Sequence, residues 1–379
     1  MLQAMLPGIV LENASDADDS VLMTKALSSD DAVIDIGHAG TAMRFLTAYF
    51  AAAAGKKVTL TGSARMKQRP IGILVAALTQ LGADIKYTEK EGYPPLLISG
   101  KALSNNKVTL QADVSSQYIS ALLLIAPKLP RGLLLSLQGN ITSRPYIQMT
   151  LALLEEAGVQ SSFKANSIKV APLSQSEPRP RILIESDWSS ASYFFSMIAL
   201  SPIDTELTLT SFNAHSRQGD SGLIAIYKQL GVSTHFSGNA MTLRKTGPPT
   251  AYLMLNLVQM PDIAQTIVVT CIGLGVGCSL TGLHTLRIKE TDRLLALQTE
   301  LVNLGASVSV TTDSIAVKPA VVLKSGIRIN TYNDHRMAMA FAPLAIKVPI
   351  CIIDAEVVSK SYPGFWTDLQ SVGFKPETC

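Results

Sequence analysis

The chain has 379 residues, of which 47% are hydrophobic and 16% are charged. This length predicts two domains, and this composition supplies a large apolar core while excluding an intrinsically disordered chain. The net charge of +3, from 32 basic and 29 acidic residues, excludes a strongly basic surface of the kind that binds nucleic acid.

Amphipathic segments that end in glycine recur along the chain at intervals of roughly 70 residues. Each segment predicts a helix with one buried face, which in one copy consists of Ile71, Leu74, Leu78 and Leu81. A strand-like run follows each glycine, and glycine is typical of a helix C-terminus because it adopts positive φ. The glycines are Gly82, Gly158, Gly231, Gly305 and Gly373.

A second series of helices alternates with the first. These segments carry almost no charge, as expected of helices that are buried on all sides. They begin at Ala39, Ser115, Ser189, Asp262 and His335. The long uncharged run at 263–286 belongs to this series, and its four glycines divide it into a helix, a turn and a strand. We therefore do not interpret it as a membrane span.

Strand-like runs of Val, Ile, Leu and Thr lie between the helices, so each repeat holds one buried helix, one amphipathic helix and strands. The predicted fold class is α/β, with three such repeats in each of two similar domains. The Pro- and Arg-rich stretch at 174–181 is the expected crossover, which gives domains of 1–180 and 181–379. The first repeat is incomplete, because only MLQAM (1–5) remains of its buried helix.

Basic and hydroxyl residues gather just before or within the first turn of the amphipathic helices. The segments are ARMKQRP (64–70), TSRPY (142–146), HSRQGD (215–220), LRIKETDR (286–293) and SKSYP (359–363). A helix N-terminus carries partial positive charge, so cations there are unfavourable unless an anion compensates. We interpret the set as a site for phosphate or carboxylate groups. For any single copy, a solvated surface is the alternative.

Two acidic residues stand among these cations. Asp262 opens a buried helix, which fits a helix cap, and Glu290 lies beside Lys289, which fits an ion pair. Each carboxylate is also a candidate general base, because fixed cations position it and set its proton affinity. Both roles stay open for each residue.

The five histidines and four cysteines show neither HExxH spacing nor a CxxC pair, so we predict no metal site and no cofactor. The start of the chain has no basic segment followed by an apolar run. We therefore expect a cytoplasmic protein without a membrane or nucleic-acid partner.

Motifs along the whole chain resemble those of one family, the 3-phosphoshikimate 1-carboxyvinyltransferases, also called EPSP synthases. The ordered set is specific, although no single motif decides it. The motifs are AGTAMR (39–44), RMKQRPIG (65–72), EGYPPL (91–96), SSQY (115–118), SRPY (143–146), SDWSSASYF (186–194), RQGD (217–220), PD (261–262), RIKETDRL (287–294), YNDHRMAMA (332–340) and SKSYP (359–363). The resemblance implies two domains of three βαβαββ-type units each, an inside-out α/β barrel, with the active site in the cleft between them.

The resemblance also implies an activity: transfer of the enolpyruvyl group of phosphoenolpyruvate to the 5-hydroxyl of shikimate 3-phosphate. This reaction releases phosphate and belongs to chorismate and aromatic amino acid biosynthesis. The partners would be these two small molecules, and the protein would be a monomer.

The family's site residues map onto matching positions of this sequence. Phosphoenolpyruvate would be bound by Gly40, Arg69, Arg293, Arg336 and Lys360. Shikimate 3-phosphate would be bound by Ser115, Ser116, Gln117, Ser143, Tyr146, Asp262, Thr285 and Lys289, with Thr285 at a position where the family often has Asn. The catalytic residues would be Asp262, Glu290 and Lys360.

One departure concerns the N-terminus. The family's Ser-Lys-Ser segment, which supplies a catalytic lysine, does not precede MLQAM (1–5). We therefore expect a shortened chain, and a substrate-binding but catalytically impaired fragment is one alternative. The other is the sister enolpyruvyl transferase that acts on UDP-N-acetylglucosamine, although its reactive loop cysteine is missing before SSQY (115–118).

Overall fold

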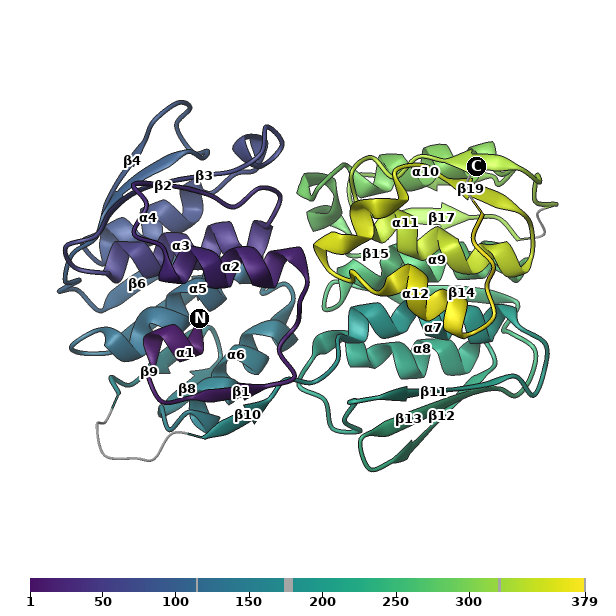
Figure 1. Ribbon diagram of the computed structural model, residues 1–379, viewed down its shortest axis with the longest axis horizontal. Helices are drawn as coiled ribbons and strands as arrows, with labels where there is room; N and C mark the ends of the chain where they lie inside the picture. Colours follow the sequence, from purple (N-terminus) through teal and green to yellow (C-terminus); the bar gives the residue numbers. More distant parts are fainter. Residues whose placement is uncertain (114, 174–179, 320–321, 378–379) are drawn as a thin grey trace. The chain divides into compact units, whose positions relative to one another are not determined.

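The computed structural model describes residues 1–113, 115–173, 180–319 and 322–377. The chain divides into two compact units, Met1–Ile184 and Glu185–Cys379, coloured purple to teal and teal to yellow in Figure 1. This division falls after residue 184 rather than after residue 180, because β10 (Arg181–Leu183) pairs in parallel with β1 (Val10–Glu12) of unit 1. Most of the crossover predicted at 174–181 lies outside the described residues.

Unit 1 contains two four-stranded sheets that share one strand order. The first sheet has the order β2 (Val33–Asp35), β3 (Lys57–Thr61), β5 (Leu96–Ser99), β4 (Asp84–Tyr87). The second has the order β6 (Lys107–Gln111), β7 (Leu133–Gln138), β9 (Ser167–Val170), β8 (Ser161–Lys164). In both, the first two strands are parallel and the others antiparallel.

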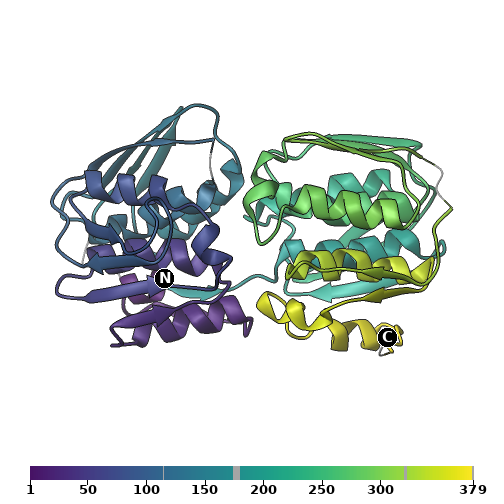
Figure 2. The ribbon, with the colours of Figure 1, turned by 90° about the horizontal axis from the view of Figure 1, so that it is seen from above.

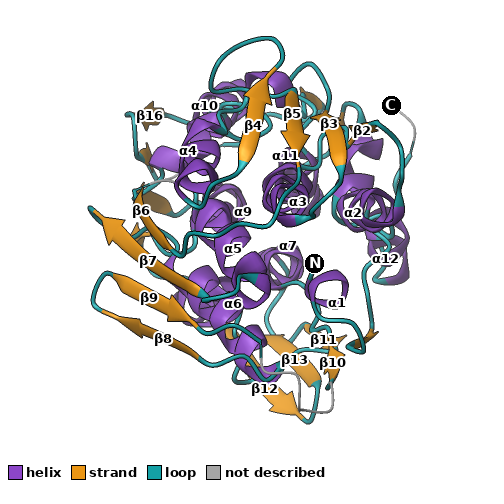
Figure 3. Ribbon diagram, turned by 90° about the vertical axis from the view of Figure 1, so that its left-hand side faces the viewer, coloured by secondary structure: helices purple, strands orange, loops and turns teal. Residues whose placement is uncertain are grey.

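A buried and an amphipathic helix accompany each of these sheets. They are α3 (Gly40–Ala52) with α4 (Gly72–Gln80), and α5 (Ser116–Ile125) with α6 (Arg144–Glu156). The chain order around each sheet is therefore βαβαββ. Figure 3 shows α3 almost end-on, with the strands of the first sheet on one side of the helices and those of the second on another. Two short helices, α1 (Leu2–Met5) and α2 (Asp18–Ser28), flank β1.

Unit 2 repeats the arrangement. The sheet β14 (Tyr252–Asn256), β15 (Gly277–Thr281), β17 (Ile315–Val317), β16 (Val308–Val310) has the same order and the same parallel first pair. A second sheet contains β11 (Glu206–Thr210), β13 (Ala240–Lys245) and β12 (Val232–Ser237), all antiparallel. A third pairs β18 (Ile327–Ile329) with β19 (Ile350–Ile352) in parallel. The prediction of a two-domain α/β fold is confirmed.

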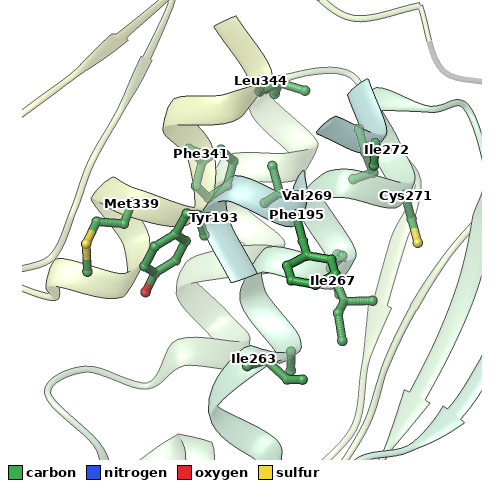
Figure 4. Packing of buried hydrophobic residues seen from close by; sticks show 14 of the residues in the cluster. Tyr193, Phe195, Ile263, Ile267, Val269, Cys271, Ile272, Met339, Phe341 and Leu344 are labelled. Carbon is green, nitrogen blue, oxygen red and sulfur yellow. The ribbon is translucent and has the colours of Figure 1, made fainter. Parts of the chain in front are cut away.

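The core of unit 2 is formed by three largely apolar helices, α7 (Trp188–Leu200), α9 (Ala264–Gly273) and α11 (His335–Phe341). They run side by side (Figures 1 and 2), and α9 contacts both of the others. Figure 4 shows Phe195 of α7, Ile267 of α9 and Phe341 of α11 in this core; all three are fully buried. Burying a side chain of this size contributes about 1.5–3 kcal/mol. These three helices are mostly buried, as predicted, whereas α3 of unit 1 keeps a partly exposed side that includes Phe45 and Tyr49.

The amphipathic helices of unit 2 are α8 (Leu223–Gln229), α10 (Arg293–Asn303) and α12 (Phe365–Ser371). The predicted apolar face of α4 is confirmed, since Ile71, Leu74, Leu78 and Leu81 are fully buried. The five glycines predicted to end the amphipathic helices all have positive φ, between +81° and +101°. No L-residue with a β-carbon adopts that backbone easily, so glycine is required there.

The uncharged run at 263–286 forms α9 and β15, with a left-handed turn at Gly275 between them, as predicted. Within the described ranges, no helix is both long enough and apolar enough to cross a membrane.

Two of the helix-ending glycines differ in the space around them. A β-carbon on Gly231 would lie 2.1 Å from the carbonyl oxygen of Gly247, whereas one on Gly373 would meet no atom within 4 Å. Gly373→Ala should lower the free energy of unfolding by about 1–2 kcal/mol, because an L-residue is unfavourable in the left-handed conformation. Gly231→Ala should lower it further, because its β-carbon would also collide with the Gly247 carbonyl oxygen. Urea unfolding of unit 2 in both variants measures this, and equal losses would contradict it.

Candidate active site

A group of charged side chains in unit 2 surrounds the guanidinium of Arg293, the first residue of α10. Its Nε donates to Asp334 Oδ2 (2.6 Å) and its Nη2 to Asp334 Oδ1 (3.2 Å). Nη1 donates to Asp262 Oδ1 (3.0 Å) and Nη2 to Glu290 Oε2 (2.9 Å). The Arg293 side chain is only 2% exposed. Three carboxylates therefore fix one buried cation, and the cation fixes them.

Three further cations border this group and reach its exposed side. Lys289 Nζ lies 3.1 Å from Asp262 Oδ1, and Lys360 Nζ lies 2.8 Å from Glu290 Oε1. Arg336 Nη1 donates to the main-chain carbonyl oxygen of Asp262 (3.3 Å). The side chains of these three cations keep 14–19% of their surface exposed. They are therefore positioned to meet a ligand, whereas Arg293 is mostly enclosed.

Helix starts bring these residues together. Asp262 lies in η4 (Pro261–Ile263), directly before α9, and Arg336 lies in the first turn of α11. Asp334 caps α11, since its Oδ1 accepts from the main-chain nitrogen of Arg336 (2.9 Å). Glu290 precedes α10, and Lys360 ends η7 (Ala355–Lys360). The N-terminal ends of α9, α10 and α11 thus converge, where unpaired N–H groups favour negative charge.

The neighbouring cations govern the ionisation of Asp262. Burial would raise the pKa of Asp262, but Lys289, Arg336 and Arg293 together hold it well below its usual range. Burial, reinforced by Arg293, lowers the pKa of Lys289 although Asp262 acts in the opposite direction. Asp262 is therefore a carboxylate at any working pH, held as an acceptor of hydrogen bonds.

The charge of the group depends on His335 and on the balance between cations and carboxylates. Burial, together with Lys360 and Arg336, holds the pKa of His335 well below its ordinary value, so this histidine is neutral. The four cations Lys289, Arg293, Arg336 and Lys360 then face the three carboxylates of Asp262, Glu290 and Asp334. The partly exposed side chains of Lys289, Arg336 and Lys360 favour an anionic ligand over a cation. Among the described residues, no group of His, Cys, Asp and Glu side chains could hold a metal ion.

In unit 1 the predicted residues Gly40 and Arg69 lie against each other. A β-carbon at position 40 would lie 2.6 Å from Arg69 Nη1 and 3.0 Å from its Cζ. Arg69 is 7% exposed and ends η1 (Met66–Gln68) as its C-cap, while Gly40 begins α3. The glycine is therefore needed for space: it lets a guanidinium rest on the start of a helix.

The remaining unit 1 residues lie at the starts of α5 and α6, two helices in contact. Ser115 caps α5, accepting from the main-chain nitrogen of Gln117 (3.4 Å), and Gln117 Nε2 donates to Thr41 Oγ1 of α3 (2.9 Å). Ser143 caps α6 in the left-handed region (φ 51°), and the main-chain nitrogen of Tyr146 donates to its carbonyl (3.1 Å). Ser116 is the first residue of α5.

Thr285 of unit 2 lies in η5 (His284–Ile288), and its buried Oγ1 has no hydrogen-bond partner among the described residues. A buried hydroxyl without a partner is costly, which fits a group that a ligand completes.

The predicted set omitted three residues that belong to this geometry. Asp334 holds Arg293 and caps α11, and its signal was an acid directly before a largely apolar helix. Ser189 Oγ accepts from Arg336 Nη2 (3.4 Å) and donates to buried Asp220. Arg44 is buried in α3, where its Nη1 donates to the Gly40 carbonyl (2.9 Å).

Comparison with known proteins decides the family. The sequence profile of EPSP synthase (3-phosphoshikimate 1-carboxyvinyltransferase) matches residues 6–369. A 3-phosphoshikimate 1-carboxyvinyltransferase of Bacteroides fragilis is 49% identical over 373 residues, which are 96% of this chain and 89% of that protein. One from Colwellia psychrerythraea is 38% identical, over 89% of this chain and 78% of that protein.

The chain belongs to the EPSP synthase family. The structure of EPSP synthase from Acinetobacter baumannii shares its fold, with a TM-score of 0.74 at 20% identity over 98% of this chain and 92% of that one. The function of this EPSP synthase family member is enolpyruvyl transfer to 3-phosphoshikimate in aromatic amino acid biosynthesis, which confirms the predicted transferase activity.

The Arg293–Asp334 pair should matter for stability. Asp334→Ala removes two hydrogen bonds from the buried guanidinium of Arg293 and also the cap of α11. It should therefore destabilise unit 2 by about 3–5 kcal/mol, although Asp262 and Glu290 still bind Arg293. Glu356→Ala, at an exposed acid of the same unit, should change it by less than about 0.5 kcal/mol. Urea unfolding measures both, and similar small losses would show that the pair is not stabilising.

His335 should make the stability depend on pH. Its pKa is lowered in the folded state but stays near 6.5 in the unfolded chain, so below that pH the unfolded state binds the additional proton. Unfolding free energy should therefore fall as the pH drops from 7 to 5, by up to about 1.4 kcal/mol per pH unit from this residue. In His335→Gln the unfolding free energy should depend less steeply on pH, because this contribution is missing. Unfolding curves at several pH values test it, and identical slopes would refute it.

Proposed function

We propose that the cations of both units bind the same pair of substrates. Arg69, Arg336 and Lys360 bind the carboxylate and phosphate of phosphoenolpyruvate, beside Gly40. Arg293 adds its charge to this group while holding the carboxylates in place. Shikimate 3-phosphate is bound by Lys289, Asp262 and Thr285 of unit 2 and by Ser115, Ser116, Gln117, Ser143 and Tyr146 of unit 1.

The charge balance supports this assignment. Each substrate carries a phosphate and a carboxylate, so about six negative charges must be gathered before they can react. Arginine forks bind such groups through paired hydrogen bonds, which give orientation as well as attraction. The observation that carries the proposal is the set of partly exposed cations, Lys289, Arg336 and Lys360, beside the ionised carboxylate of Asp262.

The reaction requires two opposite proton movements. The 5-hydroxyl oxygen forms a bond to C2 of phosphoenolpyruvate and passes its proton to Asp262, while the C3 methylene gains a proton from the pair of Glu290 and Lys360. In the second stage the bond from C2 to the phosphate oxygen breaks, phosphate leaves, and C3 returns its proton. A group that serves both directions must be able to give and to take a proton.

The geometry supports separate roles for the two acids. Asp262, ionised and bonded to Lys289 and Arg293, accepts a hydrogen bond from the hydroxyl and orients it. Glu290 and Lys360, 2.8 Å apart, form the pair that exchanges the proton with C3. Cations already in place stabilise the charge that builds on the departing phosphate. We further propose a monomeric enzyme of the cytoplasm.

A phosphate-release assay with both substrates tests the proposed site. Lys360→Met and Arg336→Met should each lower kcat/KM by about 10²–10³-fold, as expected for a lost pre-organised charge. Arg328→Met, at an exposed cation of the same unit, is the matched control and should stay within about twofold. The proposal fails if the wild-type chain releases no phosphate, or prefers UDP-N-acetylglucosamine as acceptor.

Gly40→Ala tests the unit 1 part of the site separately. The new β-carbon would collide with the Arg69 guanidinium, so Arg69 must move away from its ligand. We expect the KM for phosphoenolpyruvate to rise by about tenfold or more, with a smaller effect on shikimate 3-phosphate. Steady-state kinetics with each substrate varied in turn measure both, and an unchanged KM for phosphoenolpyruvate would remove Arg69 from the site.

A further inference from the structure

A further buried acid, Glu300, lies on the helix that begins with Arg293. Glu300 is fully buried, and its Oε1 accepts from the Tyr332 hydroxyl (2.5 Å) and from Asn330 Nδ2 (3.3 Å). Within the described residues no lysine or arginine pairs with it. Burying a carboxylate without a cation is unfavourable, so Glu300 does not serve charge balance.

The partner of Glu300 lies in a strained turn. Tyr332 and Asn333 both have left-handed backbones, with φ of 55° and 54°. Two consecutive L-residues with side chains rarely adopt this conformation, and it persists only where surrounding contacts hold it. The residue that follows is Asp334, which binds Arg293 and caps α11.

Helix α10 therefore holds this turn at two points. Arg293 and Glu300 are seven residues apart, two helical turns, so both face the same side of α10. Arg293 binds Asp334 after the turn, and Glu300 binds Tyr332 within it. Burial, with the hydrogen bond to Glu300, raises the pKa of Tyr332 to about 12, so the hydroxyl stays a donor.

We propose that Glu300 is a positioning residue for the enolpyruvyl transfer. Its hydrogen bond to Tyr332 keeps the turn in the one conformation that places Asp334. Asp334 in turn holds the guanidinium of Arg293 and caps the first turn of α11, which carries Arg336. This inference rests on the proposed function, since Arg336 is there a ligand of phosphoenolpyruvate. Loss of the bond should therefore affect phosphoenolpyruvate more than shikimate 3-phosphate.

Four variants test it. Glu300→Ala and Tyr332→Phe each remove the bond, whereas Glu300→Gln keeps a carbonyl oxygen that can accept from the same hydroxyl. Val302→Ala, at a 47% exposed position of α10, controls for substitution in this helix. The bond-removing variants should raise the KM for phosphoenolpyruvate by about tenfold and change that for shikimate 3-phosphate by less than about twofold. Glu300→Gln should restore most of the loss.

The double variant Glu300→Ala/Tyr332→Phe should raise the KM for phosphoenolpyruvate no more than either single variant does, because both substitutions remove the same hydrogen bond. A merely structural role would lower the amount of folded protein and kcat without separating the two KM values. The inference is overturned if both KM values rise together, if neither changes, or if Glu300→Gln behaves like Glu300→Ala. If Glu300→Ala does not fold, Tyr332→Phe, which keeps the partly buried ring, decides by the same criteria.

A readout without substrates separates this inference from the proposed function. Amide hydrogen exchange of the peptide 330–337 should be faster in Glu300→Ala and Tyr332→Phe than in wild type or Val302→Ala. If the two variants exchange faster but the wild-type chain releases no phosphate, Glu300 still holds the turn and the proposed function is rejected. Normal exchange with an active wild type would reject the positioning role alone.

Discussion

A guanidinium enclosed by three carboxylates is the interaction on which the site of this family member depends. Arg293 is almost inaccessible to solvent, and isolated burial of its charge would be prohibitive. Asp262, Glu290 and Asp334 compensate that charge, and each is fixed by it. Because these acids come from the starts of different helices, the network also sets how α9, α10 and α11 meet.

The cations of this network have two different roles. Arg293 donates its hydrogen bonds to protein carboxylates, so it determines the shape of the site. The side chains of Lys289, Arg336 and Lys360 instead keep exposed surface for ligands. Such pre-organisation is what electrostatic catalysis requires, because the charges need not rearrange when a bond breaks. The left-handed turn at Tyr332 and Asn333 is the local strain that accompanies this arrangement.

The sequence predicted the helices well, because their signals are local. Charge-free runs marked the buried helices, and glycines such as Gly82 and Gly305 marked the helix ends that prove to have positive φ. Pairing between distant strands is not local, so the link between β1 and β10, which moves the division of the chain to residue 184, could not be read from it.

The cations of the site could be predicted from the sequence, but most of the acidic residues that hold them in place could not. Repeated Arg and Lys at helix starts pointed to Arg69, Arg293 and Arg336, but a single Asp before a helix reads as an ordinary cap. The second role of Asp334, as the bidentate partner of Arg293, depends on a contact across 41 residues. Glu300 gave no signal, since a lone acid on an amphipathic helix is normally solvated.

The most direct test of this account is a crystal structure with shikimate 3-phosphate and an unreactive analogue of phosphoenolpyruvate bound. The account predicts one analogue molecule contacted by Arg69, Arg336 and Lys360 together, while Arg293 keeps its bonds to Asp262, Glu290 and Asp334. An analogue bound by residues of one unit alone, or an Arg293 released from its carboxylates, would contradict it.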